Sequence, residues 1–306
     1  MRLLITGAGG FLGAEITRQA QADARITALR LVDSAPLPGS PGAECLVGDL
    51  RDETLRTRML DGADVVIHLA AMLGGAAEAN PVAAREINVD VPMAMIEALR
   101  GGPTRLVFAS SIAVLGPDLP DPVTDAAPVA PVMLYGAHKA MIETALGCEA
   151  RNGRLDAVSL RPSGIVARDG LDGALKSAFL SRLFWAVARG QDITLPVAPG
   201  GRTWLASVRN VAANFLAAAL HPGPLPADPV TLPALAPTFG ALAEALRRHV
   251  PGSASRVTFA PEPEAMRLFG QFPGLETARA AALGLKADTD LAALITGALS
   301  SDPEET

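Results

Sequence analysis

Residues 1–13 read Met-Arg-Leu-Leu-Ile-Thr-Gly-Ala-Gly-Gly-Phe-Leu-Gly, and this stretch decides the fold. A short apolar run is followed at once by glycines and then by the apolar start of a helix. A turn this tight needs residues that tolerate positive φ, and a pyrophosphate reaches the N–H groups of a helix N-terminus only where no Cβ intervenes. We therefore expect a dinucleotide-binding turn, made by Gly7, Gly10 and Gly13 with Phe11 and Leu12 opening the helix.

Asp33 strengthens this prediction. It follows the apolar run 26–32 and stands 33 − 13 = 20 residues beyond the last glycine, where a carboxylate can accept both ribose hydroxyls. The glycines alone could form a turn that binds nothing, but together with Asp33 they favour a dinucleotide. A carboxylate repels a 2′-phosphate, and residues 34–36 offer no arginine to hold one. The expected cofactor is therefore NAD rather than NADP.

Short apolar runs alternate with helix-length segments through the first half of the chain. Apolar runs without polar alternation are typical of strands covered on both faces, and a strand-helix-strand order indicates a parallel sheet with right-handed crossovers. We predict an α/β fold, a Rossmann-type doubly wound parallel sheet of six or more strands. The expected strands are 3–5, 26–32, 64–69, 105–108 and 157–160, and the expected helices are 11–22, 52–60, 81–99 and 131–150.

The composition changes beyond Arg161, where Pro/Gly-rich stretches (196–201 and 221–229) separate helical segments. We predict an NAD-binding domain over 1–165, a smaller, irregular C-terminal substrate-binding lobe mainly over 166–299, and a flexible tail over 300–306. The helices expected in the lobe are 175–188, 211–220, 239–250 after the N-cap Thr238, and 273–283 before Gly284.

The composition excludes several classes of protein. With 49% hydrophobic and 19% charged residues, the 306-residue chain can bury a core, so wholesale disorder is excluded. The formal net charge of −6 argues against binding nucleic acid or anionic membranes by bulk charge. Cys45, Cys148 and the four histidines fit no metal-site spacing. There is no signal-peptide core or membrane-spanning apolar run, so we expect no membrane association and a cytoplasmic location.

Asp49 allows two interpretations. It follows the apolar run 46–47 and precedes Leu50, a position from which its carboxylate could hydrogen-bond the adenine amino group. An aspartate after a strand is also a common helix cap, and either Asp49 or Asp52 could cap the helix that follows. Both interpretations stay open on the sequence alone.

Tyr135 and Lys139 are four residues apart in a predicted helix, so their side chains share one face. A nearby ammonium favours the phenolate and lowers the pKa of a tyrosine from its reference value of about 10. The phenolate could then take a hydroxyl proton while a hydride leaves the same carbon for nicotinamide. A Tyr-x-x-x-Lys pair is common by chance, but Tyr135 is the single tyrosine of the chain.

Taken together, these residues resemble the extended short-chain dehydrogenase/reductase family, which includes NAD-dependent epimerases and dehydratases. The resemblance covers about the first 170 residues and rests on the glycine run, Asp33, Asp49-Leu50, His68-Leu69-Ala70-Ala71, Asn88, Ser110-Ser111, Val114, Gly116, Tyr135, Lys139 and Arg161-Pro162. It implies that Ser111 positions the substrate hydroxyl, that Tyr135 is the acid/base, and that Lys139 binds the nicotinamide ribose and tunes Tyr135. It also implies that the cofactor site is lined by Leu69, Ala70, Ala71, Asn88 and Pro162.

The second half of the chain is similar to family members that oxidise sugar acids. The similarity lies in 202–207, 231–235, 272–274 and 278–280. It implies oxidation of the C2 hydroxyl of a four-carbon sugar acid to a 2-keto acid. The carboxylate of such a substrate calls for a cationic partner, preferably an arginine fork. Our candidates for substrate contacts are Arg202 first and Arg168 second as the fork, with Ser163 and Trp204, although an aromatic residue between apolar neighbours is more often core.

Two other functions remain open. A sugar-nucleotide epimerase or dehydratase would use the same residues but hold NAD through its whole cycle. A non-enzymatic NAD-binding scaffold would keep the fold, but retention of Ser111, Tyr135 and Lys139 counts against it. As partners we expect a small-molecule substrate and a second copy of the chain. Segments 81–99 and 131–150 carry apolar residues on more than one face, and the resemblance implies that such helices pair in a homodimer.

Overall fold

A seven-stranded parallel sheet forms the centre of the structure, a computed structural model that describes residues 1–37, 41–170 and 177–300. The strand order is β10-β6-β5-β4-β1-β2-β3, so the order reverses between β1 and β4. Ligands of such sheets bind at the carboxyl ends of the strands beside this reversal. The strands are β1 (Arg2–Thr6), β2 (Ala28–Asp33), β3 (Ala43–Val47), β4 (Val65–His68), β5 (Arg105–Ala109), β6 (Ala157–Arg161) and β10 (Val230–Thr231). The predicted fold class and sheet are confirmed.

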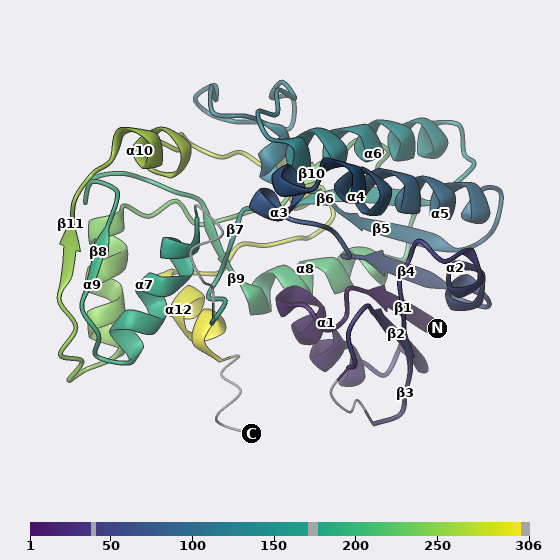
Figure 1. Ribbon diagram of the computed structural model, residues 1–306, viewed down its shortest axis with the longest axis horizontal. Coiled ribbons are helices and arrows are strands. Elements are labelled where there is room, and N and C mark those ends of the chain that lie inside the picture. Colours follow the sequence, from purple (N-terminus) through teal and green to yellow (C-terminus); the bar gives the residue numbers. More distant parts are fainter. Residues whose placement is uncertain (38–40, 171–176, 301–306) are drawn as a thin grey trace.

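Helices cover both faces of the sheet (Figure 1). On one face, Ile16 of α1 and Phe215 of α8 are fully buried in one apolar core, and on the other Met95 of α5 and Leu146 of α6 belong to a second core. A π-helical turn (Glu86–Asp90) joins α4 to α5. The helices of this part are α1 (Phe11–Gln21), α2 (Glu53–Leu60), α3 (Gly74–Ala79), α4 (Pro81–Arg85), α5 (Val91–Leu99), α6 (Leu134–Arg151) and α8 (Val208–Ala219).

A smaller lobe lies beside the carboxyl ends of the strands, at the left of Figure 1. It has its own apolar core, which includes Phe184, Leu242 and Leu294. Its elements are β7 (Gly164–Val166), α7 (Ala178–Ala188), β8 (Ile193–Leu195), β9 (Leu205–Ser207), α9 (Phe239–His249), β11 (Val257–Phe259), α10 (Pro263–Phe269) and α12 (Leu291–Leu299). Two elements from beyond residue 165, α8 and β10, nevertheless pack on or join the central sheet. The division of the chain at residue 165 stays a prediction.

One predicted helix is wrong. Only α11 (Ala278–Ala282) is helical within 273–283. The preceding segment runs alongside Val123, whose N–H donates to the Gly274 carbonyl at 2.8 Å and whose carbonyl accepts from the Glu276 N–H at 2.8 Å. These bonds occupy backbone groups that a helix would use internally, so tertiary pairing overrides the local helical pattern.

Other helix boundaries differ by a few residues from those predicted. The helix expected over 131–150 begins at Leu134, because the backbone at Met133 is still extended. The helix expected over 211–220 begins at Val208, because the Ser207 hydroxyl caps it by accepting from the Asn210 N–H at 3.1 Å. Of the helix expected over 175–188, residues 175–176 lie outside the described residues, as do residues 301–306 of the expected tail.

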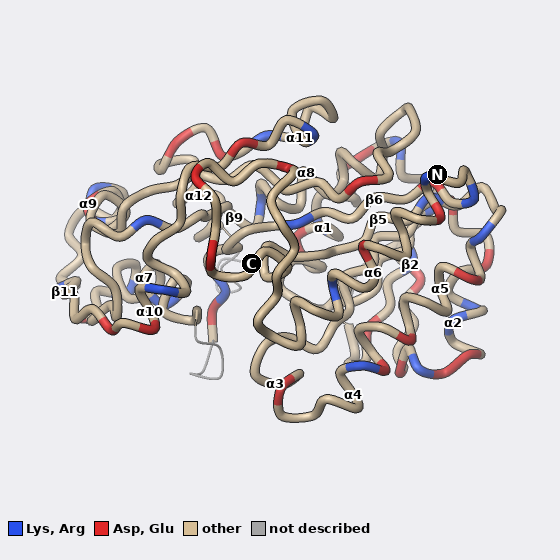
Figure 2. The backbone as a smooth tube through the Cα atoms, turned by 90° about the horizontal axis from the view of Figure 1, so that it is seen from above, with Lys and Arg blue, Asp and Glu red and all other residues tan. Residues whose placement is uncertain are grey.

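Acidic and basic residues are interspersed along the chain, as Figure 2 shows. Many of them pair with a neighbour of opposite charge, as Arg25 does with Asp23 at 2.6 Å and Arg256 with Asp192 at 2.7 Å. Within the described ranges, none of the helices combines the length and the apolar character that crossing a membrane requires.

Candidate active site

The glycine turn after β1 has the backbone shape that its sequence predicts. Gly7 has φ +70°, and a Cβ on it would fall 2.9 Å from the Ala70 nitrogen. A Cβ on Gly13 would fall 2.2 Å from the Gly7 carbonyl oxygen, so only glycine lets α1 approach β1 this closely. Gly10 is the N-cap of α1 and has no side chain to cover the N–H groups of the first turn, which starts at Phe11 and Leu12. These groups can receive an anion.

Asp33 closes the same turn from β2. One of its carboxylate oxygens accepts from the Gly9 N–H at 2.9 Å, and the other accepts from the Ala35 N–H at 3.2 Å. A Cβ on Gly9 would stand 3.2 Å from the first of these oxygens, so glycine leaves the approach to the carboxylate open. The open turn and the carboxylate beside it therefore fit the pyrophosphate and a ribose of NAD.

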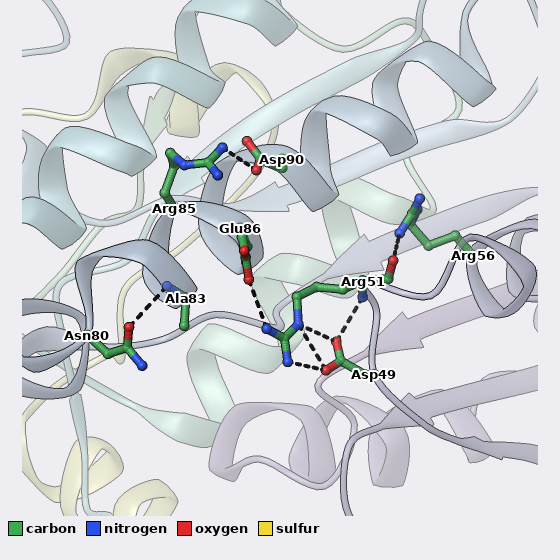
Figure 3. Close-up of polar contacts among 8 residues, drawn as sticks. All are labelled: Asp49, Arg51, Arg56, Asn80, Ala83, Arg85, Glu86 and Asp90. Carbon is green, nitrogen blue, oxygen red and sulfur yellow. Dashed lines mark hydrogen bonds and ion pairs between the residues drawn. The ribbon is translucent and has the colours of Figure 1, made fainter.

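Asp49 does not cap a helix. The cap of α2 is Asp52, whose carboxylate accepts from the Thr54 N–H at 2.8 Å. The Asp49 carboxylate pairs with the Arg51 guanidinium at 2.6 Å, and Arg51 also reaches Glu86 in the π-helical turn at 2.8 Å (Figure 3). The buried Leu50 follows Asp49. Of the two interpretations, this geometry leaves open the one in which Asp49 and Leu50 bind adenine.

Asn88 positions the loop after β4. Its side chain is 2% exposed, and its amide oxygen accepts from the Met72 N–H at 2.8 Å while its amide nitrogen donates to the Met72 carbonyl at 2.9 Å. The loop residues Leu69, Ala70 and Ala71 are half-buried beside the glycine turn. Asn88 thus holds the segment predicted to line the cofactor site.

The structure brings together the three predicted catalytic residues. Ser111 follows β5 and lies close enough to Tyr135, near the start of α6, to lower the pKa of that phenol. Lys139 lies one turn further along α6, with Nζ 5.6 Å from the centroid of the Tyr135 ring and 4.4 Å from that of the Phe108 ring on β5. The Lys139 side chain is 1% exposed. The ends of β5 and α6 therefore meet in one cluster.

Burial controls the ionisation of this cluster. It raises the pKa of Tyr135 to about 12, against the opposing effects of the Ser111 hydrogen bond and the Arg168 charge. Burial also lowers the pKa of Lys139 to about 7, although the Glu143 carboxylate acts to raise it. We predicted that the lysine would bring the phenol pKa down. In the protein without cofactor the pKa of Tyr135 is raised instead, because the burial of Tyr135 outweighs the groups that lower it.

Arg168 is the cation beside the tyrosine. It follows β7 and is half-buried, burial lowers its pKa, and the charge of Tyr135 opposes that shift. Its guanidinium carbon lies 5.5 Å from the centroid of the Phe11 ring, at the glycine turn. Pro162 and Ser163 follow the end of β6 and are buried. The Ser163 hydroxyl is buried without a hydrogen-bond partner among the described residues.

Arg202 and Trp204 are the other two candidates for substrate contacts, and Trp204 packs in one apolar cluster with Val114 and Leu115, which follow Ser111. The Arg202 side chain is exposed, while its backbone N–H and carbonyl bond to Gly270 and Phe272. Trp204 is 1% exposed, packs on Phe272 with 4.7 Å between ring centroids, and donates its indole N–H to the Pro273 carbonyl at 2.9 Å. These contacts account for Trp204 as a packing residue.

Sequence reasoning missed Glu143, which is 4% exposed beneath the catalytic cluster. Its signal was present in the helical spacing, because Tyr135, Lys139 and Glu143 follow one another at intervals of four residues. Within the described ranges, no cluster of three or more histidine, cysteine, aspartate or glutamate side chains is arranged to hold a metal ion.

Comparison with known proteins agrees with this geometry. Residues 3–226 match the NAD dependent epimerase/dehydratase family. The D-erythronate dehydrogenase of Cupriavidus necator is 34% identical over 308 residues, 94% of each chain, and that of Haemophilus influenzae is 29% identical over 307 residues, 95% of this chain and 96% of the other. The crystal structure of a nucleoside-diphosphate-sugar epimerase from Agrobacterium tumefaciens superposes with a TM-score of 0.88 at 29% identity, over 100% of this chain and 95% of that one. The chain therefore belongs to the NAD dependent epimerase/dehydratase family, the extended short-chain dehydrogenases/reductases.

Proposed function

We propose that the protein oxidises the C2 hydroxyl of a small sugar acid resembling D-erythronate to a 2-keto acid, with NAD as the hydride acceptor. Two relatives matched along nearly the whole chain carry the name D-erythronate dehydrogenase. The structural observation that carries the proposal is that Arg168 is half-buried 5.5 Å from the Phe11 ring at the glycine turn, close enough for its charge to act on Tyr135. In a 2-hydroxy acid the carboxylate is attached to the reacting carbon, so its cationic partner must lie next to the acid/base.

Each residue of the site would have a separate role in the reaction. Arg168 binds the carboxylate, and Ser111 and Tyr135 receive the hydroxyl. Tyr135 takes the hydroxyl proton on its Oη as the phenolate, after its own proton has passed to water; the charge of Arg168 favours this form, against the effect of burial on the pKa of Tyr135. NAD, when bound, accepts the hydride from the same carbon. Proton and hydride thus leave together, and the carbon becomes the carbonyl of the 2-keto acid. Lys139 is held between Phe108 and Tyr135, where it can bind the nicotinamide ribose.

We assign to Arg168 the carboxylate contact for which Arg202 was our first candidate. A guanidinium near Tyr135 serves both the substrate charge and the phenolate, because each is stabilised by a nearby cation. Ser163 supports the same location for the substrate, since a buried hydroxyl without a partner gains a hydrogen bond when a substrate hydroxyl or carboxylate reaches it.

A panel of three- to six-carbon sugar acids tests the reaction, with UDP-sugars as controls and the absorbance of NADH as the readout. We expect NADH from a short 2-hydroxy sugar acid and none from UDP-sugars. Turnover of UDP-sugars without net NADH would instead indicate an epimerase or dehydratase. NAD binding with no turnover of either class would indicate a scaffold.

Matched arginine variants test the carboxylate partner. Arg168→Met should raise KM strongly and lower kcat/KM at least about tenfold, because a charge-assisted bidentate contact is lost. Arg202→Met removes an exposed arginine of the same lobe and should change kcat/KM little. The amide of the best sugar acid should be a poor substrate of the unmutated enzyme and lose little more in Arg168→Met. Equal losses for acid and amide would show that Arg168 shapes the lobe without reading the carboxylate.

We further propose that the protein is a cytoplasmic homodimer. Exposed apolar side chains gather on α4, on the segment before α6 and on α6 itself: Val82, Val129, Val132, Met133 and Met141. Cys45 and Cys148 are both exposed free thiols, as suits a reducing compartment.

A further inference from the structure

Glu143 is a buried carboxylate at the junction of the segments that carry the proposed catalytic residues. Arg161, the last residue of β6, donates from Nε and Nη2 to the two carboxylate oxygens, both at 2.7 Å. Ser110, directly before Ser111, donates its hydroxyl to the same carboxylate at 2.5 Å. One carboxylate therefore ties together the ends of β5 and β6 and the helix α6.

The charges in this region are unbalanced without Glu143. Arg161 is 4% exposed and Lys139 is 1% exposed, so both cationic side chains are almost completely shielded from water. An arginine does not release its proton at physiological pH. If the carboxylate were absent, burial would act on Lys139 without the opposing charge of Glu143, and burial favours loss of the ammonium proton.

No other group facing Lys139 provides this negative charge. From β4 it faces His68, which is neutral because burial lowers the pKa of the imidazole to about 3. From β5 it faces the Phe108 ring, and from its own helix the Tyr135 ring. Tyr135 is protonated at neutral pH in the protein without cofactor, since its pKa is about 12. Within the described residues the carboxylate that acts on Lys139 is Glu143.

We propose that Glu143 is a positioning residue, which holds the ends of β5, β6 and α6 together and serves as the buried counter-ion of Lys139. The inference rests on the roles proposed above for Lys139 and Tyr135 and adds the group that keeps Lys139 charged. A residue that acted by packing alone would need the shape of glutamate but not its charge. A variant that removes the charge of Glu143 but keeps its shape therefore distinguishes the counter-ion role from a packing role.

The test uses Glu143→Gln, which keeps the shape, and Glu143→Asp, which keeps the charge. Glu149→Gln is the matched control, because Glu149 lies on the same helix, is 6% exposed and pairs with Arg154 at 2.6 Å. The affinity for NAD is measured across pH by tryptophan fluorescence, together with the free energy of unfolding in urea. Measuring NAD binding alone requires no knowledge of the substrate.

In the unmutated protein we expect the affinity for NAD to fall with rising pH, as Lys139 loses its proton. We expect this fall to be absent in Lys139→Met. Glu143→Gln should move the fall to lower pH by about one unit or more, because an adjacent opposite charge is removed. Glu143→Asp should move it less, and Glu149→Gln should leave it in place. Both variants of Glu143 should be less stable than the unmutated protein, since Arg161 loses part or all of its partner.

If Glu143→Gln lowers the stability but the decrease in NAD affinity stays at the same pH, the counter-ion role is wrong and Glu143 has only a packing role. If the fall persists in Lys139→Met, the proposed role of Lys139 is wrong, and the counter-ion role fails with it. If Glu143→Gln does not fold, the double variant Glu143→Met with Arg161→Met removes both charges of the pair. The fall should still move to lower pH there, because Lys139 has lost the carboxylate that acts on it. No movement would again overturn the proposal.

Discussion

Tyr135 is the single tyrosine of the chain, so its role can be tested without competing groups. Tyr135→Phe should lower turnover by about 10²–10⁴ while leaving the affinity for NAD nearly unchanged, because only the proton acceptor is lost. Turnover and NAD binding are measured separately, by NADH absorbance and by fluorescence. Turnover within about tenfold of the unmutated enzyme would remove Tyr135 from the mechanism.

Lys139 makes the stability of the protein depend on pH. Its pKa is about 7 in the folded protein against a reference value of 10.5, so between these values the unfolded chain binds more protons than the folded one. The free energy of unfolding should therefore rise with pH in this window, by up to about 1.4 kcal/mol per pH unit from this group. Below pH 7 both states hold the proton, so the dependence on pH ends while the destabilisation by the buried ammonium is at its largest.

Urea denaturation of the protein without cofactor at several pH values within this window measures the effect. Lys139→Met should be more stable than the unmutated protein near neutral pH, and its stability should rise less with pH. Lys286→Met replaces an exposed lysine and should keep the slope of the unmutated protein. Equal slopes in all three proteins would show that Lys139 is charged equally in the folded and unfolded states.

Asp33 should exclude NADP. Its carboxylate faces the glycine turn, where the 2′-phosphate of NADP would meet an uncompensated negative charge. Asp33→Ala should weaken NAD binding and bring the kcat/KM value with NAD closer to the value with NADP. Equal use of NAD and NADP by the unmutated enzyme would contradict this expectation.

At the scale of helices and strands, predictability followed the length of the pattern. The strands β1, β2, β4, β5 and β6 are four to six residues long and mostly apolar, and their sequence predicted them. The strand β3 has five residues but is interrupted by Glu44, and it was not predicted. The strands β7, β8, β9 and β11 have three residues each and β10 has two, too few for a periodic signal. Their extended backbone depends on partners distant in the sequence, as β7 pairs with β9 and β8 with β11.

The cap of α8 offers a test at this scale. The Ser207 hydroxyl accepts from the Asn210 N–H at 3.1 Å and donates to Asp288 at 2.6 Å, and the residue is 1% exposed. Ser207→Ala should lower the free energy of unfolding by about 2–3 kcal/mol, because a cap is lost and a carboxylate loses a partner. Thr238→Ala, which removes only the exposed cap of α9, should cost about 1 kcal/mol. Equal losses in urea denaturation would show that the bond to Asp288 adds nothing.

At the scale of the whole molecule, spacing along the chain could predict the cofactor turn but not the substrate pocket. The glycines and Asp33 belong to neighbouring strands, so their contact follows from a known crossover. Arg168 and Arg202 both follow the central domain in sequence, and nothing local distinguishes them. Arg168 meets Tyr135 because β7 leaves the end of β6 directly, whereas Arg202 follows a chain that first passes through α7 and β8.

The dimer is the last prediction, and it belongs to the molecule as a whole. Met141 is 53% exposed on α6, only two residues from Lys139, so the same helix presents one face to the active site and another to solvent. Sedimentation should give a mass of 2 × 31.5 = 63 kDa for the unmutated protein. Met141→Glu should shift it toward 31.5 kDa, because a charge in the centre of an apolar interface loses its water.

Val47→Glu is the matched control, since Val47 is also 53% exposed but lies on β3 at the far edge of the sheet. It should leave the dimer intact. A mass of 31.5 kDa for the unmutated protein would exclude the dimer, and equal dissociation by both variants would place the interface elsewhere. Because Lys139 points away from the face that carries Met141, monomers of Met141→Glu should still bind NAD. Loss of NAD binding on dissociation would mean that the partner copy holds α6 in its active position.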